Sequence, residues 1–152
     1  AAWCGERAVC LAATADPAVI ANRDLITEGV ARTVREILGD TEYDLRFRSY
    51  GAGASTLFPG AATGIGDPGE VFFLIEAIAA SADIAKAVVG VTKQHMLHFG
   101  FPGRFSTGGN LAFPFTPPEI LAGPAYRFSV YHVTECDDLA AAFPVEMVSV
   151  AG

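Results

Sequence analysis

The chain has 152 residues, of which 51% are hydrophobic and 18% are charged, and its formal net charge is -7 at pH 7. This length suits a single domain with a sizeable core, and the acidic excess argues against nucleic-acid binding, which depends on clustered Lys and Arg. The apolar composition indicates surface that a partner chain or a further part of a larger protein covers.

The first part of the chain predicts two strands and one helix. Residues 6–13 form a short apolar run, as in a strand buried on both faces. Asp16 and Pro17 suit the start of a helix, and its apolar spacing continues to Gly39, a residue that can end a helix in the left-handed conformation. Residues 43–50 alternate between apolar and polar side chains, which predicts an edge-type strand.

The second part predicts a similar unit after a long connection rich in Gly, Ala and Pro, residues 51–69. Residues 70–79 are apolar on both strand faces, and Ser81 is a suitable cap for a helix over residues 82–99. An insertion, residues 100–124, precedes an alternating strand over residues 125–133. The remaining tail is expected to add one short helical turn and one extended piece.

The order β-α-β-β-α-β predicts an α+β domain over residues 1–152 with a ferredoxin-like sheet, two helices on one face, and a long insertion between helix two and strand four. Strands 6–13 and 70–79 are expected at the centre of the sheet. Their apolar side chains on the face without helices then need a cover, which is either the insertion or a partner. We expect the apolar back half of the insertion, residues 111–115, to cover this sheet face.

The polar front half of the insertion is the main candidate for ligand binding. Backbone N–H groups of a glycine-rich loop beside a cation suit a carboxylate or phosphate, and the candidates here are Arg104, Ser106, Thr107, Gly109 and Asn110. The stretch meets neither the P-loop nor the dinucleotide-binding fingerprint. The alternative is a tight turn whose glycines only supply positive φ.

Histidines extend the candidate ligand-binding set to His98 and His132. His95 and His98 continue an apolar row of the second helix, so we expect both to face inward or along an interface. Glu135 and Cys136 are chemically suitable as further metal ligands, but the spacing matches no metal motif. Histidines that cap the last carbonyls of a helix are the favoured explanation, and we expect no metal and no other cofactor.

Other polar residues give weaker indications. Ser106 or Thr107 as a nucleophile would need an oriented base, and no GxSxG elbow is present, so no catalytic residue is assigned. Solvated or ion-paired side chains are the ordinary explanation for the arginines on the predicted strands, with substrate binding as the alternative; these are Arg46, Arg48 and Arg127.

The cysteines and apolar segments indicate a cytoplasmic chain without a membrane partner. The three cysteines are an odd number and match neither a metal motif nor a disulfide framework: Cys4, Cys10 and Cys136. The most apolar region, residues 71–91, is interrupted by three charged residues and is a poor membrane span.

Two segments resemble the acyclic terpene utilization AtuA-like family. They read LHFGFPGRFSTGGNLAFPFTPPEI from Leu97 and GPAYRFSVYHV from Gly123, and the likeness extends more loosely to Asp16, Pro17 and the DLRFRSYG region. The sequence departs from the family pattern after Gly51, and His95 is not a family position. The resemblance corresponds to the later portion of longer family proteins.

The resemblance implies a role in the breakdown of acyclic terpenes or related branched acids, often through coenzyme A thioesters, and it transfers no catalytic residue. Two functions follow as hypotheses. The chain is a domain or subunit of a catabolic enzyme whose insertion binds a carboxylate or acyl-CoA thioester. Alternatively, it is a non-catalytic assembly domain that forms a homo-oligomer or joins a partner subunit.

Overall fold

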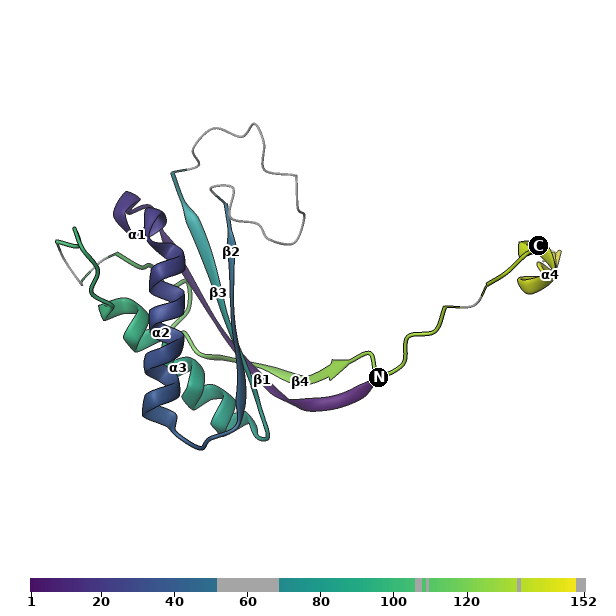
Figure 1. Cartoon of the computed structure of the whole chain (residues 1–152), viewed down its shortest axis with the longest axis horizontal. Helices are drawn as coiled ribbons and strands as arrows, with labels where there is room; N and C mark the ends of the chain where they lie inside the picture. Colours follow the sequence, from purple (N-terminus) through teal and green to yellow (C-terminus); the bar gives the residue numbers. More distant parts are fainter. Residues whose placement is uncertain (52–68, 106–107, 109, 134, 150–152) are drawn as a thin grey trace.

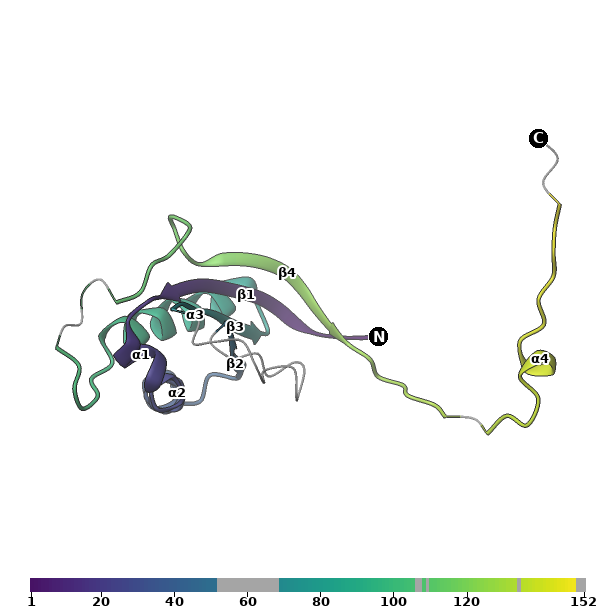
Figure 2. The ribbon, with the colours of Figure 1, turned by 90° about the horizontal axis from the view of Figure 1, so that it is seen from above.

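The computed structural model describes residues 1–51, 69–105, 108, 110–133 and 135–149. Their elements are β1 (Ala2–Thr14), α1 (Pro17–Ala21), α2 (Arg23–Leu38), β2 (Tyr43–Tyr50), β3 (Val71–Ala79), α3 (Ala82–His98), β4 (Ile120–Arg127) and α4 (Leu139–Ala142). The strands form an antiparallel sheet in the order β2-β3-β1-β4, with α2 and α3 on one face (Figures 1 and 2). The α+β class and the central positions of β1 and β3 are confirmed. None of the helices in these ranges is long and apolar enough to cross a membrane.

The single helix expected before Gly39 is two helices, which corrects the prediction. Asp16 caps α1 because its Oδ1 accepts hydrogen bonds from the backbone N–H groups of Ala18 and Val19, at 2.8 and 3.4 Å. The chain then leaves the helical path at Asn22, whose side-chain Nδ2 donates to the carbonyl of Ala18 at 2.8 Å. Asparagine side chains compete in this way with the helical ladder. Gly39 ends α2 at the expected position and with a positive φ of 53°, but its ψ of -121° differs from that of the left-handed helical conformation.

The last strand differs from the expected residues 125–133, because β4 covers Ile120–Arg127. Its last two residues, Tyr126 and Arg127, pair with Trp3 and Ala2, where β1 begins. The alternating pattern continues to Val133, but the pairing of β4 with β1 ends at Arg127. The strand therefore ends earlier than the pattern, and it begins within the predicted insertion.

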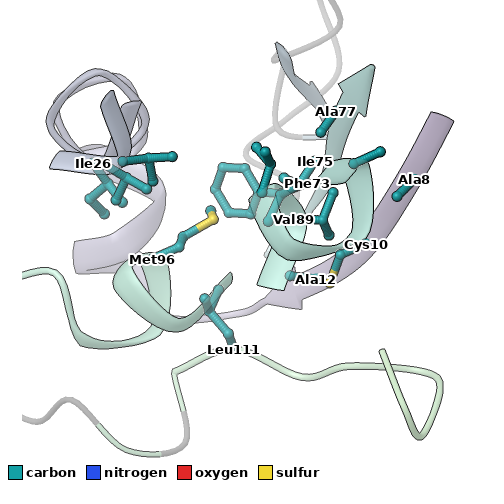
Figure 3. Packing of buried hydrophobic residues seen from close by; sticks show 14 of the residues in the cluster. Ala8, Cys10, Ala12, Ile26, Phe73, Ile75, Ala77, Val89, Met96 and Leu111 are labelled. Carbon is teal, nitrogen blue, oxygen red and sulfur yellow. The ribbon is translucent and has the colours of Figure 1, made fainter. Parts of the chain in front are cut away.

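The core lies between the sheet and the two long helices (Figure 3). Phe73 and Ile75 of β3 point toward Ile26 of α2 and Val89 and Met96 of α3, and all five are fully buried or nearly so. Burying such side chains stabilises the fold by roughly 1.5–3 kcal/mol each. Helix α3 packs on β1 and β3, and α2 packs against α3.

The back half of the insertion packs into this helix-side core, so its expected place over the opposite sheet face is wrong. Leu111 is buried and lies close to Met96, and Phe113 packs against the same cluster. Between them, Ala112 exchanges two backbone hydrogen bonds of 2.8 Å with Ala13, just before the end of β1. The insertion thus closes one end of the core.

Candidate functional site

Arg104 fastens the insertion to the end of α3. Its Nη2 donates to the carbonyl of Leu97 at 2.7 Å, and its Nη1 donates to the carbonyl of Phe99. The last carbonyls of a helix lack intrahelical N–H partners, so a guanidinium at this end satisfies them and interacts favourably with the helix dipole. These contacts give Arg104 a structural role in the described chain.

Asn110 connects Arg104 to the start of α1. Its Oδ1 accepts a hydrogen bond from Arg104 Nη2 at 3.4 Å, and its Nδ2 donates to Asp16 Oδ2. Asp16 also caps α1 through its other oxygen. Partial burial opposes ionisation of this carboxyl, but hydrogen bonds from the Ala18 backbone and the Asn110 amide outweigh it and hold the pKa of Asp16 below its ordinary value.

A shallow pocket of about 350 Å³ adjoins this network, and its lining comprises Ala13, Thr14, Ala15, Asp16, Glu70, Asn110 and Ala112. Of the candidate residues that the structure describes, only Asn110 belongs to the lining. Two carboxylates, Asp16 and Glu70, make the pocket unfavourable for a carboxylate or phosphate ligand. They suit a hydrogen-bond donor such as a hydroxyl group, or a cation.

Neither of the two candidate histidines lines this pocket. His98 is exposed at the last turn of α3, which rules out the inward one of its two expected orientations, whereas His95 is half-buried. His132 is exposed in the tail, which leaves the body at the end of the molecule opposite the insertion (Figure 1). Ser106, Thr107 and Gly109 lie outside the described residues. Among those described, no three His, Cys, Asp or Glu side chains are grouped to hold a metal ion.

Arginines gather on the sheet face opposite the helices. Glu76 of β3 is 5% exposed, and its two carboxylate oxygens lie 2.9 Å from Arg7 Nε of β1 and from Arg48 Nη2 of β2. Arg46 pairs with Asp44 in the same strand. The expectation of ion pairing is confirmed for Arg46 and Arg48.

A second pocket of about 490 Å³ lies near the start of β1, and sequence reasoning missed it. Its charged lining residues are Arg7, Glu42, Asp44, Arg46 and Arg127, and its lining also includes Trp3, Cys4 and Tyr126. Trp3 and Tyr126 are opposite each other on paired strands and are more than half exposed. Only the strand register brings these residues together, so no local sequence motif could have revealed the pocket.

No family model, curated protein or solved structure matches this chain. The likeness to the AtuA-like family therefore stays a prediction.

Proposed function

We propose that this chain is a ferredoxin-like assembly domain of an AtuA-like catabolic protein and that it forms a homo-oligomer. The ferredoxin-like assignment is supported by the strand order β2-β3-β1-β4, by antiparallel pairing throughout, and by α2 and α3 on one sheet face. The resemblance supplies the setting, which is the breakdown of acyclic terpenes or related branched acids.

The exposed apolar tail carries the proposal. In residues 128–133 and 135–149, here called the tail, every large hydrophobic side chain is at least two-thirds exposed: Phe128, Val130, Tyr131, Val133, Leu139, Phe143, Val145, Met147 and Val148. An exposed apolar surface of this kind marks an interaction site, because its burial against a partner is favourable by roughly 25 cal/mol per Å².

Sedimentation velocity of the purified chain across a wide concentration range tests this function. We expect dimers or larger species whose fraction grows with concentration. A monomer at every concentration would contradict self-assembly.

Ligand binding at the Asn110 pocket is the second candidate function, because this pocket lies beside the segment with the strongest family resemblance. Its carboxylates favour a neutral alcohol over an acyl-CoA thioester. Calorimetric titration with acyclic terpene alcohols, branched acids and acyl-CoA thioesters should show binding of an alcohol and weaker binding to Asn110→Ala. The control variant is Gln94→Ala, on the exposed side of α3. Equal affinity of Asn110→Ala and the unaltered protein would remove this pocket as the site.

A further inference from the structure

The sheet face opposite the helices carries apolar side chains that no element in the described ranges covers. Ala8, Cys10 and Ala12 point into the helix-side core, so the alternate residues Val9 and Leu11 point the other way, where both are half-buried. On β3, Leu74 is half-buried and Phe72 is 42% exposed for the same reason. We call this surface the open sheet face.

The tail leads away from its own sheet. Figures 1 and 2 show it leaving the end of β4 and running beyond the body. From Phe128 to Phe143 the sequence contains neither Gly nor Pro, the residues that most often reverse a chain, and Val130 and Val133 favour extended backbone. The tail therefore lies away from the body, where another molecule can contact it.

The charges of the tail and of the pocket at the start of β1 indicate which molecule contacts the tail. The tail contains four acidic residues and no Lys or Arg: Glu135, Asp137, Asp138 and Glu146. The pocket at the start of β1 is lined by Arg7, Arg46 and Arg127. Arg7 contacts Glu76 and Arg46 pairs with Asp44, whereas no ion pair joins Arg127 to another described residue, so Arg127 is the cation that this pocket offers to an acidic partner. Complementary potentials select partners and steer their encounter. A second copy of this chain supplies both an acidic, apolar tail and a surface that matches it.

We infer that the tail of one copy docks on the open sheet face of a second copy. The acidic residues of the tail then face the pocket at the start of β1, here called the arginine pocket. A two-fold exchange of tails covers both open faces and buries both sets of apolar side chains. This inference rests on the proposed self-assembly and specifies the two surfaces that perform it.

The chain's own cysteines allow a direct test. Cys4 lines the arginine pocket and Cys136 lies in the tail, and both are exposed free thiols. Burial, with a smaller contribution from Glu119, raises the pKa of the Cys10 thiol to about 11, so that thiol should react slowly at neutral pH. Light and heavy-isotope-labelled protein are mixed, diluted so that oligomers dissociate, and reconcentrated so that mixed oligomers form. A flexible bismaleimide then cross-links neighbouring thiols, and the digested protein is analysed by mass spectrometry.

We expect Cys4–Cys136 peptide pairs that join a light chain to a heavy chain, and we expect these pairs to disappear in Cys136→Ser. Pairs formed only within one isotope, although native mass spectrometry shows mixed oligomers, would mean that each tail covers its own sheet, which overturns exchange between copies. Oligomers without any Cys4–Cys136 pair overturn the tail contact but leave self-assembly intact. A monomer without such pairs overturns both proposals.

Substitutions on the open sheet face give an independent measurement. Phe72→Lys places a charge among the apolar side chains, and Arg127→Glu reverses a charge in the arginine pocket. We expect each to raise the dissociation constant of the oligomer roughly tenfold, about 1.4 kcal/mol. Ile37→Lys and Arg32→Glu, at exposed positions of α2, are the controls and should leave it unchanged. Equal dissociation constants in all four folded variants would contradict the proposed surface.

Discussion

Gly5 lies where β1 shifts register against β4, and its backbone has φ 136°, a value that L side chains rarely adopt. An added Cβ would lie 2.4 Å from the backbone oxygen of Ala79 on the neighbouring strand β3. Because neither backbone can move without breaking the pairing of β1 and β3, this position requires glycine.

We expect Gly5→Ala to lower the free energy of unfolding by about 2 kcal/mol or more, through the steric overlap and the strained φ. The control is Gly123→Ala, because Gly123 also has positive φ but no atom within 4 Å of its added Cβ. Urea unfolding measures both. A loss for Gly5→Ala no larger than that for Gly123→Ala would contradict the steric explanation.

Asp16 makes the stability depend on pH. The pKa of Asp16 in the folded protein lies below its ordinary value of 3.8. Its carboxylate therefore adds to the free energy of unfolding above pH 3.8, and this contribution is lost as the pH falls through the folded-state pKa. Asp16→Asn keeps the shape of the cap but removes the charge. We expect the free energy of unfolding of this variant to fall less than that of the unaltered protein between neutral and strongly acidic pH. Urea unfolding along a pH series tests this, with exposed Asp40→Asn as the control. Parallel curves for the unaltered protein and Asp16→Asn would show that the Asp16 carboxylate is not responsible.

At the scale of elements, Arg104 holds the insertion and the end of α3 together. We expect Arg104→Met to lower the free energy of unfolding by about 1.5–3 kcal/mol, because the charged hydrogen bonds to the carbonyls of Leu97 and Phe99 are lost. Amide hydrogen exchange should become faster in the last turn of α3 and around Leu111, while β2 and β3 keep their protection. Arg32→Met, on the exposed side of α2, is the matched control. Unchanged exchange near Leu111 would show that apolar packing alone retains the insertion.

Elements with a strong local pattern could be predicted from sequence. The strand over residues 43–50 and the helix after Ser81 match β2 and α3 within one residue, because periodicity and an N-terminal cap are properties of neighbouring residues. The break at Asn22 was missed, since the apolar spacing continues across it. The predicted position of the last strand is wrong because the alternating pattern extends to Val133, whereas the pairing with β1 covers Ile120 to Arg127.

At the scale of the whole molecule, the tail and the open sheet face make stability depend on concentration. If association buries them, unfolding is coupled to dissociation, and we expect the melting temperature to rise with protein concentration. Differential scanning calorimetry over a series of concentrations measures this. Phe72→Lys should make the melting temperature depend less on concentration than Ile37→Lys does. A melting temperature of the unaltered protein that does not change with concentration would contradict the coupling of unfolding to dissociation.

The candidate site was predictable only in part. Arg104 and Asn110 are brought together as neighbours in one loop, which their spacing already indicated. Their partner Asp16 lies 94 residues before Asn110, and its carboxylate gives the pocket a charge opposite to the one expected for an anion site. His98 and His132 belong to segments that the fold separates. Contacts over such sequence distances leave no local pattern.

Periodicity and capping among nearby residues are enough to predict the α+β class, the central strands and most helix and strand positions. Three features could be seen only in the folded chain: where β4 ends, that Leu111 enters the helix-side core, and which arginines share a pocket. The physical reason is that each of these depends on strand register and on the competition of distant side chains for the same buried volume. Residues 128–133 of the tail, whose alternating pattern predicted a strand, lack a partner within this chain's described sheet, and we assign that partner to a second copy.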